Sequence, residues 1–365
     1  MKLRSSTSGH FTLAIALLAL PFIIDAFFGH GWVRITDFAL LYIMLALGLN
    51  IVVGYAGLLD LGYIAFFAVG AYTYALLGSP QFGLHWPMYV VLPLGALIAC
   101  GFGVLLGAPT LKLRGDYLAI VTLGFGEIIR IFLNNLNAPV NITNGPQGIS
   151  AIDPLQIGGF SFGSSYEWFG IRVDDVHLHY YLFLGFTLLV IFVSRRLEDS
   201  RIGRAWVAIR EDEVAASAMG INTRNIKLLA FAMGATFGGI SGGLFAGFQG
   251  FVSPESFSLM ESIMVLCMVV LGGMGNVGGV VLGGVLLVAL PELFRNAAGP
   301  VQQMLLGKVV VDPESLRMLM FGLALILVML WRPAGLWPST QRRREFAAED
   351  SVLQQEQETV YDASK

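Results

Sequence analysis

Apolar runs long enough to cross a lipid bilayer as helices recur along almost the whole sequence. A helix needs about twenty mostly apolar residues for this, and about ten stretches qualify. They are predicted at 11–28, 35–53, 62–77, 87–108, 117–133, 180–193, 228–248, 259–274, 278–293 and 316–331. Only 13% of the 365 residues are charged, against roughly a quarter in soluble domains. The sequence therefore predicts an all-α polytopic membrane protein and excludes a soluble enzyme, a nucleic-acid-binding protein and a disordered scaffold.

The positions of lysine and arginine test this helix count independently, because short cytoplasmic loops collect basic residues. If the N-terminus is cytoplasmic and the chain crosses about ten times, several groups of basic residues fall on one side of the membrane. They are Lys2, Arg4, Lys112, Arg114, those in 195–227 and those in 342–344. The longest connection on the other side, 134–179, has Arg172 as its only lysine or arginine. This bias predicts that both termini are cytoplasmic. The first apolar run has no small-residue cleavage site at its end, so an uncleaved helix is favoured over a signal peptide.

Two segments depart from the pattern of apolar helices. The glycine-rich stretch 54–62 lies between the second and third runs and is either a re-entrant or a broken segment. After Pro338 the chain becomes polar and charged, which is typical of a solvated extension. We therefore divide the sequence into a transmembrane domain, 1–338, and a polar cytoplasmic tail, 339–365.

Glycines recur at intervals of four, which places them on one face of a helix. Two regions show this spacing: Gly234, Gly238, Gly239, Gly243 and Gly247 in the first, and Gly275, Gly279 and Gly283 in the second. In lipid, small residues allow helix backbones to approach closely, so tight packing explains the pattern. A smooth face along which one half of the bundle slides during gating is the alternative.

Ionisable residues inside apolar runs are few, and each costs about 2.5–3.5 kcal/mol near the bilayer centre. The candidates for a functional role are Asp60, Glu261 and two acid–arginine pairs spaced by three residues, Glu127 with Arg130 and Glu292 with Arg295. The spacing predicts that each pair meets on one helix face. Asp60 and Glu261 have no obvious local partner, which leaves an ion-coupling role open.

The cytoplasmic segment 195–227 is predicted to form a short amphipathic helix. Ser200 can cap its start and Gly220 can stop it. Apolar residues on or near one face are Ile202, Trp206, Ile209, Ala216 and Met219. The neighbouring acids at 211–213 disfavour an anionic lipid surface, so a protein partner is favoured.

Motifs of catalysis are missing from the sequence. It contains no phosphate-binding G-x-x-x-x-G-K-[ST] loop, no G-x-S-x-G elbow and no H-E-x-x-H pair. His177 and His179 are expected to face solvent in an exterior loop rather than bind a metal. We expect no enzymatic activity, metal or cofactor in this chain.

Nine stretches across almost all of the membrane portion resemble the M-type permease of the branched-chain amino acid (leucine/isoleucine/valine, LIV-type) ABC importers. They are GLNIVVGYAG (48–57), LDLG (59–62), AVGAY (68–72), LRGDYLAIVTLGFGE (113–127), NGPQGI (144–149), GRAWVAIREDE (203–213), GFVSPESF (250–257) with VLGGMG (270–275), and WRPAG (331–335). The resemblance implies a transmembrane permease domain over 1–338 in the bacterial inner membrane. It also implies four kinds of partner: an unlike H-type permease, two cytoplasmic ATPases that bind the ATP, a periplasmic substrate-binding protein and the lipid bilayer.

The resemblance also implies roles for particular residues. Segment 195–227 would be the ATPase-coupling element, with Ile202, Gly203, Arg204, Trp206, Ile209, Arg210, Glu213, Ala215, Ala216 and Gly220. Ala215, Ala216 and Gly220 are similar to the EAA-x-x-x-G pattern of importer permeases, but Glu213 lies one residue too far upstream. Residues assigned to the pathway or to helix packing are Asn50, Gly54, Gly57, Asp60, Glu127, Gly239, Gly243, Gly247, Gly275 and Gly279.

Three alternatives stay open at this point. Urea, short amides or other amino acids could replace branched-chain amino acids as the substrate. An ion-coupled secondary transporter would require intramembrane acids such as Asp60 or Glu261. A passive channel is the third alternative, and the sequence has no ring-forming polar motif to support it.

Overall fold

The computed structural model describes residues 7–111, 113, 115–168 and 171–306, and further on 319, 322–323, 326–327, 330–332 and 335–338. Its long helices are α1 Thr7–Phe28, α2 His30–Asn50, α3 Ile64–Leu77, α4 Met88–Thr110, α5 Asp116–Asn135, α6 Asp175–Glu198, α9 Thr223–Gln249, α10 Leu259–Gly272 and α11 Val277–Leu306. Two short helices, α7 Arg201–Glu211 and α8 Glu213–Ala218, precede α9. The tail 339–365 and the basic residues Lys2, Arg4, Lys112, Arg114 and 342–344 lie outside the described residues, and the run 316–331 is described only in part.

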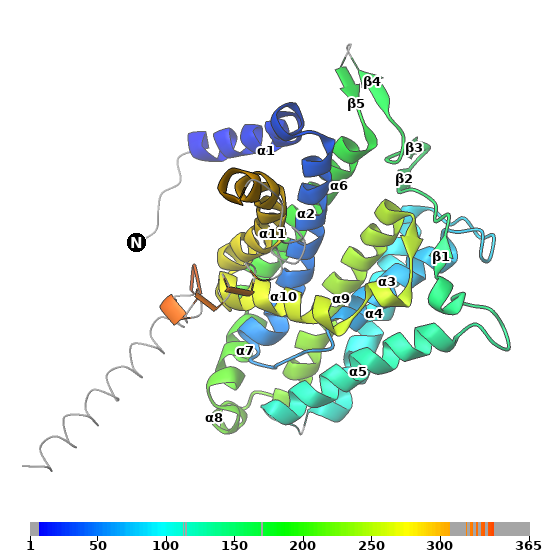
Figure 1. Ribbon diagram of the computed structural model, residues 1–365. Coiled ribbons are helices and arrows are strands. Elements are labelled where there is room, and N and C mark those ends of the chain that lie inside the picture. The colour runs from blue at the N-terminus through cyan, green and yellow to red at the C-terminus, as the bar shows by residue number, and fades with distance from the viewer. Residues whose placement is uncertain are drawn as a thin grey trace, which may run out of the picture.

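Short strands and single helical turns connect the helices. Strands β1 Ile149–Ser150 and β6 Phe251–Val252 pair antiparallel, as do β2 Gln156–Ile157 with β3 Phe160–Ser161 and β4 Tyr166–Trp168 with β5 Ile171–Val173. The turns are a π-helical turn, η1 Ile51–Tyr55, and two 3₁₀ turns, η2 Gly145–Gln147 and η3 Pro254–Ser256. Helices α7 and α8 lie at the bottom of Figure 1 and strands β4 and β5 at the top, so these elements mark opposite ends of the bundle.

Six helical segments of the described chain are long and apolar enough to cross a membrane. They are His30–Tyr55, Met88–Thr110, Asp175–Glu198, Thr223–Gln249, Pro254–Gly272 and Val277–Ala297. Shorter apolar helices are Ile15–Phe28 and Ile64–Leu77. The molecule is therefore a mostly helical, multi-pass membrane protein.

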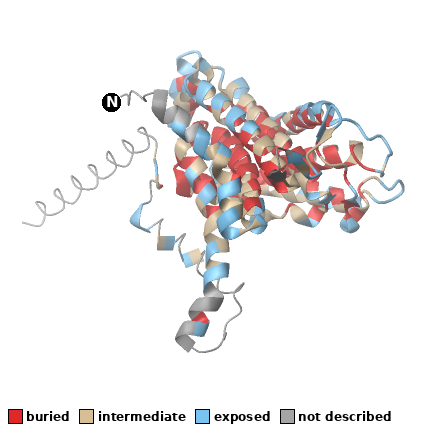
Figure 2. Ribbon diagram, turned by 90° about the horizontal axis from the view of Figure 1, so that it is seen from above, coloured by how far each residue is buried: buried red, intermediate tan, exposed pale blue. Residues whose placement is uncertain are grey.

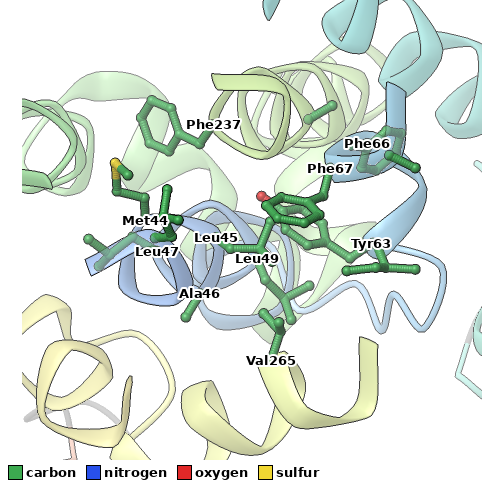
Figure 3. Close-up of a cluster of buried hydrophobic side chains, with 14 of the residues drawn as sticks. Met44, Leu45, Ala46, Leu47, Leu49, Tyr63, Phe66, Phe67, Phe237 and Val265 are labelled. Carbon is green, nitrogen blue, oxygen red and sulfur yellow. The ribbon is translucent and has the colours of Figure 1, made fainter. Parts of the chain in front are cut away.

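The core surrounds the second half of α2. Its residues Met44, Leu45, Leu47 and Leu49 have no exposed surface. Figure 3 shows these side chains among Tyr63, Phe66 and Phe67 beside α3, Phe237 of α9 and Val265 of α10. Buried residues gather in the middle of the bundle and exposed ones on its outside (Figure 2). An apolar exterior is expected here because lipid, not water, covers it.

Helix α9 packs against α3 and α4 through glycines (Figure 1). A Cβ atom at Gly239 would lie 2.6 Å from Ala99 Cβ, and one at Gly243 would lie 2.6 Å from Leu92 Cδ2. At Gly247 it would lie 2.6 Å from Leu155 Cδ2. Close packing of this kind gives helices in lipid van der Waals contact, since the hydrophobic effect does not hold them together there.

Candidate coupling site at one end of the bundle

The segment between α6 and α9 forms two helices rather than the single helix that the sequence predicts. Ser200 caps α7, accepting hydrogen bonds from the backbone N–H groups of Ile202 and Gly203, both at 3.1 Å. Asp212 then adopts an extended conformation and caps α8, accepting from Val214 N at 2.8 Å and Ala215 N at 3.0 Å. Because an aspartate that caps a helix start has non-helical backbone angles, Asp212 divides the segment.

The apolar face of α7 packs against its own chain. Trp206 is completely buried and donates a hydrogen bond from Nε1 to Ile226 O of α9 at 2.7 Å. Its ring stacks on Tyr55 of η1, with 6.5 Å between ring centroids and 5° between the planes. Ile209 and Ala216 are buried as well. These predicted coupling residues therefore hold α7 and α8 on the bundle and are not free to contact a partner.

A second contact joins α7 to η1. Arg210 donates a hydrogen bond from Nη1 to Gly54 O at 2.8 Å. Gly57 has φ of +68°, and a Cβ atom there would lie 2.6 Å from Arg210 Cγ. Glycine at position 57 therefore meets two needs: it adopts the positive φ of the turn after η1, and it leaves room for the side chain of Arg210.

An ion pair joins α8 to α9. Lys227 Nζ lies 2.6 Å from Glu213 Oε1, and the lysine side chain is 5% exposed. Beside the pair is an open cavity of about 620 Å³, lined by the end of α4 and the start of α9. Glu213, assigned to coupling on the sequence, therefore has a structural contact within the chain.

The outer surface of the two helices carries the residues open to a partner. Val214 is 68% exposed and Met219 is 84% exposed. Arg204, Ala215 and Gly220 are exposed too, whereas Ile202 is half-buried and Gly203 packs against the end of α6. Exposed apolar side chains on a helical pair outside the bundle are typical of a protein contact.

Several predicted pathway residues meet where α2 ends. Asn50 Oδ1 accepts a hydrogen bond from Gly275 N at 2.9 Å, and a Cβ atom at Gly54 would lie 2.7 Å from Gly275 N. Gly279 packs against the backbone of Gly272. The π-helical turn η1 begins at the next residue after Asn50, and such turns are frequent at functional sites.

Asp60 lies in the connection between η1 and α3 and is completely buried. One carboxylate oxygen accepts from Gly62 N at 2.9 Å, and the other has no hydrogen-bond partner among the described residues. Asp37 of α2 is equally buried, and neither of its oxygens has such a partner. Asp37 was not among the predicted residues, although its position as an acid within the apolar run 35–53 was a signal for it.

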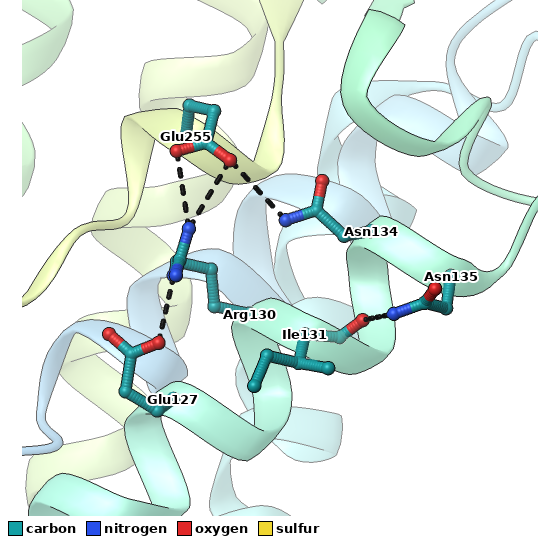
Figure 4. Close-up of polar contacts among 6 residues, drawn as sticks. All are labelled: Glu127, Arg130, Ile131, Asn134, Asn135 and Glu255. Carbon is teal, nitrogen blue, oxygen red and sulfur yellow. Dashed lines mark hydrogen bonds and ion pairs between the residues drawn. The ribbon is translucent and has the colours of Figure 1, made fainter.

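The other intramembrane acids have partners. Arg130 Nε contacts Glu127 Oε2 at 3.0 Å, as the spacing predicts, and Arg295 contacts Glu292. Figure 4 shows that Arg130 also reaches Glu255, at 3.2 Å, and that Asn134 approaches the same carboxylate. Tyr42 donates to Glu261 Oε2 at 2.6 Å, across a sequence separation of 219 residues.

The expectation that His177 and His179 face solvent in a loop is wrong. Both lie in the first turns of α6, and they are 1% and 3% exposed. Phe22 of α1 stacks on His177, and Phe248 of α9 lies beside His179. The sequence did not reveal this because the covering rings come from distant helices.

A polytopic bundle of apolar helices, with a pair of short helices fastened to one end, has the architecture of a membrane transport subunit. The chain belongs to the family of branched-chain amino acid transport system permease components, whose model matches residues 32–329.

Individual relatives agree with the family. The chain is 45% identical, over 91% of its length and 75% of the relative's, to the high-affinity branched-chain amino acid transport system permease protein LivM of Escherichia coli K12. It is 27% identical to the probable LivM of Methanocaldococcus jannaschii, over 82% of this chain and 90% of that protein. It is also 27% identical to LivH of E. coli K12, over 81% of this chain and 90% of LivH. No solved structure matches the chain.

Proposed function

We propose that this permease carries branched-chain amino acids across the bacterial inner membrane as one subunit of an ATP-driven ABC importer. Support comes from the family and from the 45% identity to a LivM permease. An unlike, H-type permease completes the pathway, two cytoplasmic ATPases bind and hydrolyse ATP, and a periplasmic protein delivers the substrate. This chain itself needs no cofactor.

The proposed topology has about ten membrane crossings, if each crossing takes about twenty residues. The shorter helices α1 and α3, the tilted α5 and the run 316–331 add to the six longer segments. Both termini and α7 with α8 lie in the cytoplasm, and the strands lie on the periplasmic side. The transmembrane permease domain is 1–338, and 339–365 is the cytoplasmic tail.

The observation that carries the coupling proposal is the double attachment of α7. Trp206 bonds to the start of α9, and Arg210 bonds to η1 at the end of α2. A push by the ATPases on α7 and α8 is therefore delivered to two central helices at once. Closure of the ATPases on ATP would shift the bundle between inward- and outward-open states.

The second permease is proposed to cover α5. Glu127 and Arg130 keep 33% and 27% of their side chains exposed on this helix. Charged groups within the apolar layer face protein or a water-filled pathway rather than lipid. The charged cluster of Glu127, Arg130 and Glu255 is thus assigned to the boundary between the two permeases, where the pathway runs.

The test of the coupling proposal is co-purification. We expect Val214→Asp with Met219→Asp to prevent recovery of the ATPases with the permease, because two desolvated carboxylates would enter the contact. Val140→Asp is the matched control, since Val140 is 63% exposed in the loop after α5. Full recovery of the ATPases with the double variant would contradict docking on this surface.

Reconstitution distinguishes the importer from an ion-coupled transporter. Purified chain alone in vesicles is expected to accumulate no amino acid on a proton or sodium gradient. Uptake should require the second permease, the ATPases, the binding protein and ATP. Concentrative uptake by the chain alone would overturn the proposal.

A further inference from the structure

Three helices bring metal-binding side chains together at the end of the bundle away from α7 and α8. Asp25 comes from the last turns of α1, His30 is the first residue of α2, and His177 lies in the first turn of α6. One potential ligand atom from each of the three lies within 4.8 Å of the other two.

The contacts divide these groups by role. Asp25 faces both imidazoles, with Oδ1 3.0 Å from His30 Nδ1 and Oδ2 3.5 Å from His177 Nε2. The other nitrogen of His30, Nε2, lies 3.5 Å from Asp174 Oδ2. A carboxylate on the far nitrogen of a metal-binding histidine is the usual arrangement that fixes the tautomer and orientation of the ring.

His177 supplies an independent observation. Its side chain is 1% exposed, and neither ring nitrogen has a hydrogen-bond partner among the described residues. Burying polar atoms without a partner is costly. The ring stacks on Phe22, with 4.9 Å between ring centroids, and its Nε2 faces the carboxylate of Asp25. A metal ion bound at Nε2 would give this one of the two nitrogens a partner.

We propose that Asp25, His30 and His177 bind a divalent transition-metal ion of the zinc class, with Asp174 orienting His30. Two imidazoles and a carboxylate suit zinc and its neighbours, whereas calcium and magnesium prefer oxygen ligands. Ligands at about 2.0–2.2 Å from a tetrahedral zinc lie about 3.4 Å apart. The three groups lie within 4.8 Å of one another, so metal binding would shorten the widest separation by up to about 1.4 Å. Water completes the fourth position.

The metal would fasten α1 to the bundle. The described hydrogen bonds between α1 and α6 are from Tyr180 to Leu17 O, at 3.0 Å, and from Tyr181 to Leu18 O, at 2.6 Å. Leu17 and Leu18 lie about two helical turns before Asp25, at about 3.6 residues per turn. Metal ligation would join the end of α1 to α2 and α6 at one point. The site does not depend on the substrate or on the ATPases.

Metal binding by the full-length chain is the direct test. The protein is purified in detergent with a tag that contains no histidine, stripped with EDTA and titrated with Zn²⁺ and, as a spectroscopic probe, Co²⁺. We expect one equivalent per chain and the visible bands of four-coordinate Co²⁺. The absence of stoichiometric binding would overturn the site.

Variants assign the ligands. His30→Gln is the main variant, because its 61% exposed side chain contributes little to packing. His85→Gln is the matched control, since His85 pairs with Asp153 at 2.6 Å and is 51% exposed, but belongs to no three-residue cluster among the described residues. We expect His30→Gln to weaken Zn²⁺ binding at least ~10-fold, and His85→Gln to leave it unchanged.

His177→Gln and Asp25→Asn should weaken binding as His30→Gln does. Asp174→Asn should weaken it about 10–100-fold, as expected for a group that orients a ligand. If His177→Gln does not fold, the difference in Zn²⁺ affinity between His30→Gln and His85→Gln still tests the assigned site. Equal Zn²⁺ affinity in wild type and His30→Gln would refute the assignment.

Discussion

At the scale of single residues, the coupling site depends on side chains whose partners are far away in the sequence. Trp206 reaches Ile226 and Tyr55, and Lys227 reaches Glu213. Each contact fastens the short helices α7 and α8 to a different part of the chain. The residues with the strongest amphipathic signal therefore serve attachment, while the exposed Val214 and Met219 are left for a partner.

The buried Lys227 gives a prediction at this scale. Glu213→Gln should destabilise the attachment of α8 by roughly 2–3 kcal/mol, because the ammonium group stays buried without its counter-charge. Adding Lys227→Met should recover most of that loss, since the charge that lacks a partner is removed as well. Protease protection of the α7–α8 segment in the two single variants and the double variant measures the effect. Equal protection in Glu213→Gln and wild type would contradict it.

At the scale of elements, the positions of helices follow from apolar runs, but their contacts do not. The predicted run 87–108 corresponds to α4 Met88–Thr110, and 228–248 lies within α9. The division of α7 from α8 and the π-helical turn η1 were not predicted. The signal for the division was Asp212, a residue type that caps helix starts. Turn η1 lies in a continuous apolar run, which does not distinguish it from α-helix. Similarly, the sequence identified Glu261 but not its partner Tyr42, which lies on another helix.

Helix α4 offers a matched pair of glycines for testing the packing against α9. A Cβ atom at Gly103 would lie 2.7 Å from Ala235 Cβ and from Phe231 O, whereas nothing lies within 4 Å of one at Gly101. Gly103→Leu should destabilise the protein by about 1–3 kcal/mol through overpacking. Gly101→Leu should stay within about 0.5 kcal/mol. The midpoint of thermal unfolding in detergent compares them, and equal midpoints would argue against close α4–α9 packing.

At the scale of the whole molecule, the two ends of the bundle differ in character. One end carries the short helices α7 and α8, and the other carries the strand pairs and the cluster of Asp25, His30 and His177. The transport function is known from the family, and the orientation in the membrane is a prediction from the basic bias of the sequence. Neither can be derived from the fold alone. The identity of the substrate likewise comes from the family and not from these helices, because the buried polar groups in the described part of the chain are scattered and do not form one binding site.

Labelling from outside the cell tests the orientation. Val140→Cys and Val214→Cys are placed in a background in which Cys100 and Cys267 are alanine. A membrane-impermeant maleimide should modify residue 140 in cells with a permeable outer membrane, and residue 214 only after the inner membrane is opened. Labelling of residue 214 in intact spheroplasts would reverse the proposed topology.

The glycine contacts of α9 bear on the proposed coupling, because they limit how far this helix can move independently of its neighbours. Where large side chains fill an interface, their rotamers can absorb a small displacement, but Gly239 and Gly242 bring α9 against the backbone of α4 at Gly95 and of α3 at Phe67. The 27 residues of α9 form a rod about 40 Å long. If the ATPases displace the start of α9 at Thr223, as proposed, we expect the closely packed helix to move as a rigid body, so that its far end at Gln249 shifts with it.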